Sequence, residues 1–275
     1  MKIACVGECT VDQYLDLADQ GRSGAYVGGI SLNFAVHSKR SGAEQVSLIS
    51  CIGTDSAGQT VLARLVAEGV DASHLSQRPG RTAEQQIRLL DNGERIFPPG
   101  GFTPGVLARY RLSRAEQAFI AGHDILVGPL YAQIEPLFEQ AMTDPAFSGR
   151  RVADFLDGSD YPDIAAKIAT WLNWLDLIFI SGDDETVAAL RPLTKHYPGL
   201  IVVTLGAAGS LALSRGDLYH QPALPVDRPV DTTGCGDAFQ AAFTVSYFRA
   251  AQIDQALYAG ARQAAQVLQH LGAIG

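Results

Sequence analysis

The stretch DTTGCGDAF, residues 231–239, places a glycine-rich turn directly before an apolar pattern with helical spacing. The small residues Gly234, Cys235 and Gly236 let an anion approach the backbone N–H groups at the start of this predicted helix, where the helix end carries a partial positive charge. Asp237 then puts a carboxylate beside the turn, where it can take a proton from an attacking hydroxyl. The alternative is a structural helix start with an aspartate as its N-cap.

Short apolar runs alternate with amphipathic segments along most of the chain. The runs typical of buried strands cover residues 3–6, 46–51, 125–127, 152–155, 177–180 and 201–204. The segments with helical spacing cover residues 32–40, 58–68, 114–121, 134–142, 164–172, 184–196, 237–249 and 253–271. This alternation predicts an α/β fold with a mostly parallel central sheet that helices cover on both faces.

Two segments lack helical spacing and interrupt this order. Residues 11–27 are polar and alternating, and residues 82–98 contain Asp91-Asn92-Gly93, which indicates a hairpin turn. We expect both segments to contribute strands to a small β lid over a substrate, and an ordinary edge hairpin is the alternative. Because the chain shows no repeat or linker, we expect one domain over residues 1–275.

The composition excludes several partners. The chain of 275 residues has a net charge of −8 and no basic run, which argues against nucleic acid. Its four cysteines show neither metal-ligand spacing nor a disulfide framework, and polar residues interrupt its apolar stretch at 171–180. We therefore expect a cytoplasmic protein without a membrane partner. The first predicted strand leads to Gly7-Glu8-Cys9-Thr10, which lacks the glycine pattern of dinucleotide-binding dehydrogenases.

Four stretches, taken in order, resemble the ribokinase-like (PfkB) sugar kinase family over essentially the whole chain. They are VGGISLNFAVHSKRSG (27–42), IGTDSAG (52–58), VTLGAAGS (203–210) and DTTGCGDAF (231–239). The resemblance implies a three-layer α/β/α fold with a β lid. It also implies transfer of the γ-phosphoryl group of ATP to a primary hydroxyl of a sugar, with Mg²⁺ and, in some members, K⁺. In the second stretch we expect mainly a helix N-cap, at Asp55 or Ser56.

The resemblance assigns the chemistry to the glycine-rich turn that precedes the last two predicted helices. Asp237 matches the catalytic base, and Gly234, Cys235 and Gly236 match the anion hole, of which Gly234 and Gly236 also contact ATP. Cys235 stands where the family usually has alanine. Its backbone N–H is the same, so we expect activity to survive. A catalytic thiol is the alternative for Cys235.

The sugar site is implied at the other end of the chain. Asp12 matches a lid-hinge aspartate that holds substrate hydroxyls, and Gly28, Gly29 and Asn33 complete that pocket. Two glycines let the backbone approach a sugar closely, and the asparagine amide can both donate to and accept from hydroxyls.

Nucleotide and cation positions follow from the same resemblance. Thr204, Gly206 and Gly209 match the strand and loop that bracket the phosphates and ribose of ATP. Asp231 and Thr233 match positions whose backbone helps to hold a monovalent cation in some members, so K⁺ is a candidate cation at this site and activation by K⁺ is left open.

The magnesium stretch departs from the family pattern. Glu185 matches the glutamate that organises Mg²⁺ through water, but Gly182 stands where an asparagine is usual. The carboxylates of Asp183 or Asp184 could substitute, because Mg²⁺ takes oxygen ligands and keeps waters. The alternative is an acidic first turn of a helix, which the helix dipole favours.

The acceptor is indicated by residues 82–97, TAEQQIRLLDNGERIF, which are similar to the fructoselysine 6-kinase subgroup. That similarity implies phosphorylation of the 6-hydroxyl of a fructosamine, with Glu84, Asp157 and Asp160 as candidates to pair with the amine of its tail. Fructose, ribose or a nucleoside such as adenosine are alternatives, as is a non-catalytic sugar sensor. The exposed polar lid strands also allow a homodimer.

Overall fold

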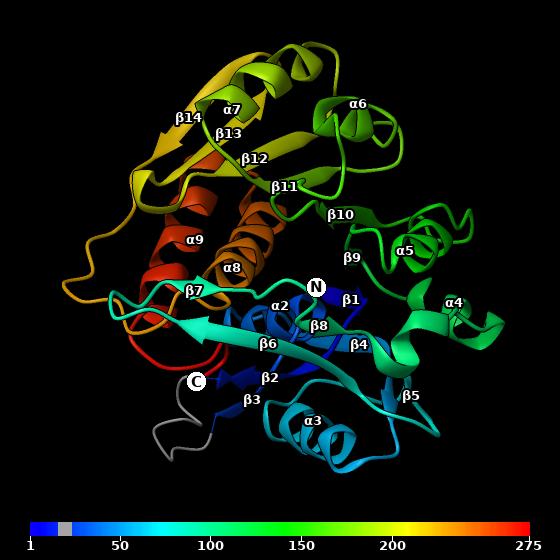
Figure 1. Ribbon diagram of the computed structural model, residues 1–275. Coiled ribbons are helices and arrows are strands. Elements are labelled where there is room, and N and C mark those ends of the chain that lie inside the picture. Colours follow the sequence, from blue (N-terminus) through cyan, green and yellow to red (C-terminus); the bar gives the residue numbers. More distant parts are fainter. Residues whose placement is uncertain (16–23) are drawn as a thin grey trace.

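The computed structural model describes residues 1–15 and 24–275 and is built around a nine-stranded sheet (Figure 1). Its strands, in spatial order, are β14 (Asp217–Gln221), β13 (Ser210–Ser214), β12 (Leu200–Thr204), β11 (Leu177–Ser181), β10 (Arg150–Asp154), β9 (Ile125–Pro129), β1 (Lys2–Val6), β4 (Gln45–Gly53) and β5 (Leu75–Arg78). The strands from β12 to β5 pair in parallel, and β13 runs antiparallel to both of its neighbours. The predicted α/β class with a mostly parallel sheet is confirmed.

Helices cover both faces because successive strand side chains point to opposite sides of the sheet. In β1, Ile3 and Cys5 join one hydrophobic cluster, whereas Ala4 and Val6 join the other. The helices on the first side are α2 (Ile30–Arg40), α3 (Ser56–Ala67), α8 (Cys235–Ala250) and α9 (Ile253–Val267). The helices on the second side are α4 (Arg114–Ile120), α5 (Glu135–Met142), α6 (Ile164–Ala169) and α7 (Asp184–Leu190). Within the described ranges, no helix is long and apolar enough to cross a membrane.

The ends of several elements differ from the sequence prediction. The helix expected over 184–196 stops at Leu190 and continues as a 3-10 turn, Arg191–Lys195, because Pro192 has no N–H to donate to the helical ladder. The helices expected over 164–172 and 253–271 end at Ala169 and Val267. The hairpin of β13 and β14 was missed, since the half-exposed β14 lacks an apolar run.

The two interrupting segments form a second, small sheet. It contains β2 (Thr10–Tyr14), β3 (Ala25–Gly28), β6 (Ala83–Leu89), β7 (Arg95–Ile96) and β8 (Phe102–Thr103), in the order β3-β2-β6-β7, with β8 also paired to β6. Part of the first predicted lid segment, residues 16–23, lies outside the described residues. Pairing of this sheet between two subunits stays a prediction.

The hairpin turn lies where the sequence places it. The Leu90 N–H donates to the Glu94 carbonyl at 2.8 Å, and the Gly93 N–H donates to the Leu90 carbonyl at 2.9 Å. Gly93 has a φ of +83°, a left-handed conformation that favours glycine. The loop is one residue longer than the two-residue hairpin that an Asn-Gly pair most often signals. Earlier in the chain, Asp55 is the N-cap of α3, and it was one of the two expected candidates.

Candidate active site

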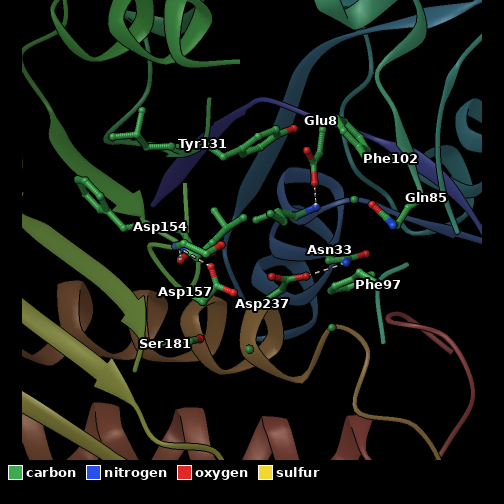
Figure 2. Close-up of a pocket in the computed structure, with 18 of the residues that line it drawn as sticks. Glu8, Asn33, Gln85, Phe97, Phe102, Tyr131, Asp154, Asp157, Ser181 and Asp237 are labelled. Atoms are coloured by element: carbon green, nitrogen blue, oxygen red, sulfur yellow. Dashed lines mark hydrogen bonds between the residues drawn. The ribbon is translucent and has the colours of Figure 1, made fainter. Parts of the chain in front are cut away.

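A cleft of about 480 Å³ opens where the parallel strands of the large sheet end and the small sheet lies against them. Among the described residues, its lining carries six carboxylates and one arginine, together with aromatic side chains. Figure 2 shows Glu8, Asp154, Asp157 and Asp237 among these carboxylates. The charged residues are Glu8, Asp12, Asp154, Asp157, Asp160, Asp237 and Arg95. The cleft is therefore strongly acidic.

The anion-binding turn opens into this cleft. Gly234 is the N-cap of α8 with a φ of +74°, and a Cβ there would lie 2.3 Å from the Cβ of Ala273. A Cβ at Gly236 would meet nothing within 4 Å, so the turn is open on that side. The first N–H groups of α8 have no carbonyl one turn earlier in the helix, which leaves them suited to an anion. Gly234 and Gly236 line the cleft, and their binding of an anion or of ATP stays a prediction.

Cys235 begins α8 but is not among the described residues that line the cleft. Burial raises the pKa of its thiol, which keeps the sulfur protonated at neutral pH. A neutral thiol is a weak nucleophile. The geometry therefore favours a backbone role for Cys235 over the catalytic-thiol alternative.

The carboxylate of Asp237 lies in the first turn of α8 and faces the cleft. It accepts a hydrogen bond from Asn33 Nδ2 at 2.7 Å. Burial raises the pKa of Asp237 to about 6, against the lowering effects of the Asn33 bond and of the nearby Arg95 charge. The group is thus mostly ionised at neutral pH, as a general base must be. Asn33 Oδ1 is buried without a partner, which leaves an acceptor for a bound hydroxyl.

The predicted sugar-binding residues gather around the same space. Thr10 Oγ1 donates to Asp12 Oδ1 at 2.7 Å, and burial raises the pKa of Asp12 to about 7. Gly28 does not line the cleft, but a Cβ at that position would lie 2.1 Å from Asp12 Oδ2. Gly29, with a φ of +100°, lines the cleft beside them. Gly28 therefore acts by making room for the Asp12 carboxylate.

Two buried carboxylates in the cleft were missed by the sequence analysis. Glu8 follows β1 and accepts a hydrogen bond from the Ile30 N–H at 3.1 Å, and burial raises its pKa to about 8. Asp154 ends β10 and accepts a hydrogen bond from the Leu156 N–H at 3.0 Å. Burial and the charge of Asp237 raise the pKa of Asp154 to about 7. Both residues could have been found from their position just at or after the end of a predicted strand, since ligands of open α/β sheets bind at the carboxyl ends of strands.

Arg95 was also missed, because it reaches the site only through the docking of the small sheet. Its Nη1 donates to the Thr232 carbonyl at 3.0 Å, just before the anion-binding turn. The Thr232 N–H in turn donates to the Gly93 carbonyl at 2.9 Å. The β6–β7 hairpin is thereby fastened to the loop that leads into α8.

The other residues predicted to contact the nucleotide lie outside the described lining of the cleft; they are Thr204, Gly206 and Gly209. Thr204 ends β12, and its hydroxyl shares a hydrogen bond of 3.0 Å with the hydroxyl of Ser181, which does line the cleft. Gly206 has a φ of +58°, and a Cβ there would meet nothing within 4 Å. Gly209 has a φ of +99°, and a Cβ there would lie 2.2 Å from the Gln221 carbonyl oxygen. A side chain at Gly209 would therefore clash with the fold, whereas Gly206 is exposed and has space around it.

Asp231 organises the loop before α8 with its side chain. Its carboxylate is fully buried and accepts hydrogen bonds from the Tyr14 hydroxyl at 2.5 Å, the Thr233 N–H at 2.8 Å and the Gly272 N–H at 2.9 Å. Thr233 Oγ1 is buried without a partner and Thr233 lines the cleft. Binding of K⁺ at these residues stays a prediction.

The acidic stretch before α7 is in part a helix cap. Asp183 Oδ1 accepts hydrogen bonds from the Thr186 N–H and hydroxyl, both at 2.9 Å, which lowers the pKa of Asp183. Glu185 is exposed in the first turn. The described residues hold no cluster of His, Cys, Asp and Glu that could enclose a metal ion. A Mg²⁺ ion here would thus take most of its ligands from phosphates and waters, which suits its chemistry. A role for Glu185 in holding one of those waters stays a prediction.

Of the three candidates for the amine of a substrate tail, Asp157 and Asp160 line the cleft. Asp157 Oδ1 accepts a hydrogen bond from the Ser159 N–H at 3.0 Å, and Asp160 Oδ2 accepts one from the Ala132 N–H at 2.9 Å. Glu84 lies outside the lining and pairs with Arg81 at 2.6 Å.

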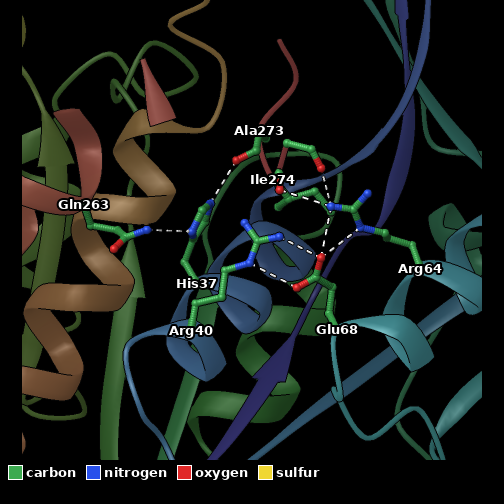
Figure 3. Close-up of polar contacts among 8 residues, drawn as sticks. His37, Arg40, Arg64, Glu68, Gln263, Ala273 and Ile274 are labelled. Carbon is green, nitrogen blue, oxygen red and sulfur yellow. Dashed lines mark hydrogen bonds and ion pairs between the residues drawn. The ribbon is translucent and has the colours of Figure 1, made fainter. Parts of the chain in front are cut away.

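The C-terminal residues Ala273 and Ile274, which lie next to the anion-binding turn, are held by hydrogen bonds to α2 and α3 (Figure 3). His37 Nε2 donates to the Ala273 carbonyl at 2.9 Å, and burial lowers the pKa of His37 to about 4, which keeps it neutral. Arg64 donates to the Ile274 carbonyl at 3.1 Å and pairs with Glu68 at 3.0 Å. Ala273, which packs against Gly234, is therefore fixed in position by these hydrogen bonds.

Known proteins match this chain over its full length. The pfkB family carbohydrate kinase model matches residues 1–125 and 135–275. Fructoselysine 6-kinase of Escherichia coli (strain K12) is 33% identical over 98% of both chains. Fructosamine kinase FrlD of Bacillus subtilis (strain 168) is 32% identical over 100% of this chain and 93% of its own.

A solved structure matches the fold and contains the expected nucleotide. A putative ribokinase II from E. coli, in complex with ATP and Mg²⁺, superposes with a TM-score of 0.80 at 21% identity, covering 99% of this chain and 94% of its own. The ribokinase-like fold, the acidic cleft and the open turn before Asp237 all agree with the family match. This chain belongs to the pfkB family of carbohydrate kinases and is an ATP-dependent phosphotransferase that acts on a sugar.

Proposed function

We propose that this kinase transfers the γ-phosphoryl group of ATP to the 6-hydroxyl of a fructosamine such as fructoselysine. The observation that carries the proposal is the charge of the cleft, where six carboxylates meet one arginine among the described lining residues. A fructosamine has a protonated amine, and fructose has no charge. The likeness to two fructosamine-type kinases at 32–33% identity supports the same acceptor.

Electrostatics favours a cationic acceptor over a neutral one. Burial raises the pKa of Glu8 to about 8 and that of both Asp12 and Asp154 to about 7, and repulsion by neighbouring carboxylates, Asp237 in each case, adds to the effect. A positive charge nearby stabilises the ionised carboxylates. A neutral hexose would leave the repulsion among the carboxylates unchanged. Only an amine-bearing sugar would relieve it, and this relief would add to the binding free energy of that sugar.

The proposed mechanism uses groups that face one another in the cleft. Asp12 and Asn33 Oδ1 bind sugar hydroxyls, and Asp237 takes the proton from the 6-hydroxyl as its oxygen attacks the γ-phosphorus. The first N–H groups of α8 stabilise the charge on the transferring group. Mg²⁺ bound to the ATP phosphates would neutralise part of that charge, with Glu185 holding one of its waters. The small sheet keeps bulk water from competing with the sugar.

An acceptor panel tests the proposal. ADP release with MgATP is measured for fructoselysine, fructose, ribose and adenosine, and kcat/KM is compared. We expect fructoselysine to exceed fructose by at least about tenfold, the size of one charge-assisted hydrogen bond. A higher kcat/KM for fructose, ribose or adenosine would overturn the fructosamine assignment, and ADP release with none of the four would contradict it as well.

Arg95 is expected to set the pH at which the base becomes active. Its positive charge lowers the pKa of Asp237, so the Arg95→Met variant should raise that pKa above about 6. Because the ionised form of Asp237 is the active one, the acid limb of the kcat/KM profile should move to higher pH. Arg95→Lys keeps the charge and should leave the limb near its wild-type position. An unmoved limb in Arg95→Met would show that this charge does not act on the base.

A further inference from the structure

The Tyr131 hydroxyl is a polar group in the cleft that no role described above uses. Tyr131 follows β9, is 7% exposed and lines the cleft. Its hydroxyl is buried and has no hydrogen-bond partner. Burying a hydroxyl without a partner costs free energy, so an unpartnered hydroxyl at a cleft wall indicates a partner supplied by a ligand.

The side chain is held in place by its surroundings. Its ring packs edge-on against Phe102 of β8, with centroids 6.0 Å apart and an interplanar angle of 81°. Its backbone carbonyl accepts a hydrogen bond from the Ile134 N–H at 3.1 Å. The hydroxyl is therefore aimed by packing between the large sheet and the small sheet.

Figure 2 shows the Tyr131 hydroxyl directed toward the Glu8 side chain, while Asp237 lies apart from that hydroxyl, across the space between them. Glu8 is 7% exposed, and one of its oxygens is held by the Ile30 N–H at 3.1 Å. No hydrogen bond joins Glu8 to Tyr131 among the described contacts. A carboxylate and a hydroxyl that face each other without touching can both accept from a cation between them.

The chemistry of the acceptor places a cation at this end. In a 6-phosphorylated hexulose, C1 and C6 are the two ends of the carbon chain. A sugar whose 6-hydroxyl meets Asp237 directs C1 toward the Glu8 end, and in a fructosamine C1 carries the amine. We propose that Tyr131 and Glu8 form the subsite for this C1 ammonium group, so that Tyr131 determines the preference for amine-bearing ketoses. This inference rests on the proposed function.

The test compares three acceptors: fructose, 1-amino-1-deoxyfructose, which has the amine without a tail, and fructoselysine. In the Tyr131→Phe enzyme, the kcat/KM of both amine-bearing sugars relative to fructose should fall at least about tenfold, as for the loss of a hydrogen bond to a charged group. The change should lie mainly in KM. Glu8→Gln keeps an oxygen for the Ile30 N–H but cannot ionise beside a bound ammonium group, so it should lower the same two ratios.

Tyr161→Phe is the matched control. Tyr161 also lines the cleft, but its hydroxyl already donates to Glu135 at 3.1 Å, so this variant should keep the wild-type ratios. Thermal unfolding supplies a second readout. Removal of an unpaired buried hydroxyl should leave the Tm of Tyr131→Phe unchanged or higher.

The outcomes separate the subsite from the function. If the wild-type enzyme does not prefer the amine-bearing sugars over fructose, the proposed function fails and the subsite with it. If the wild type prefers them and Tyr131→Phe keeps the same ratios, the function stands and the subsite is overturned. An equal loss on all three acceptors, or a clear fall in Tm, would also overturn the subsite, because the hydroxyl would then serve the ring or the fold.

Discussion

The Asp237→Asn enzyme is expected to have a kcat lower by roughly 10²–10⁴-fold, the usual contribution of a general base. Asparagine has nearly the same shape and can still bond to Asn33, so the fold should be intact. Loss of a negative charge beside the phosphates should leave ATP binding equal or tighter. Single-turnover ADP formation measures the chemical step, and calorimetric titration with MgATP measures binding.

Asp254→Asn is the control for this substitution. Asp254 is an exposed aspartate in the first turn of α9, so it matches Asp237 in its place on a helix but lies outside the cleft lining. That variant should turn over at the wild-type rate. A rate near wild type in Asp237→Asn itself would remove Asp237 from the role of base.

The Gly234→Ala enzyme is expected to lose stability and activity together. At a φ of +74° an alanine is strained by about 1–3 kcal/mol, and its methyl carbon would lie 2.3 Å from the Cβ of Ala273. Ala273 cannot easily withdraw, since His37 holds its carbonyl and Arg64 holds that of Ile274. The turn must shift instead, which moves its N–H groups off the phosphate. Urea unfolding and kcat measure the two effects.

Gly236→Ala separates the two effects. A methyl group there meets nothing within 4 Å, and alanine is the better helix former at this position, so the free energy of unfolding should be unchanged or higher. The new methyl still faces the open side of the turn, so kcat should fall. An unfolding free energy for Gly234→Ala equal to that of the wild type would contradict the close packing against Ala273.

Features encoded in neighbouring residues could be predicted from the sequence. The buried parallel strands are continuous apolar runs. The turn at 234–236 is a short stretch that needs a left-handed glycine at one position. Asp12 and Asn33 come within a few residues of the strand and glycines that place them. The match to the family motifs named these positions, and in the structure Asp12, Asn33 and the two glycines of the turn line one cleft. Their roles in binding and catalysis stay predictions.

Positions that depend on the convergence of distant elements could not be predicted in this way. Glu8 and Asp154 become neighbours only because their strands end at the same edge of the sheet. Arg95 reaches the cleft only because the small sheet docks and its guanidinium bonds to Thr232. Tyr131 follows a strand of the large sheet, and its ring packs against Phe102 of the small sheet. A single arginine or tyrosine in a sequence gives no sign of such a meeting, and a carboxylate gives one only by its place at the end of a strand.

The position of the new phosphate on the product tests the central proposal most directly. Wild-type enzyme is incubated with MgATP and fructoselysine, and the product is examined by ¹H–³¹P correlation NMR. We predict one phosphorylated sugar whose phosphorus couples to the two protons on C6. Phosphorus coupled to protons of another carbon, or ADP release without any phosphorylated fructoselysine, would contradict the account.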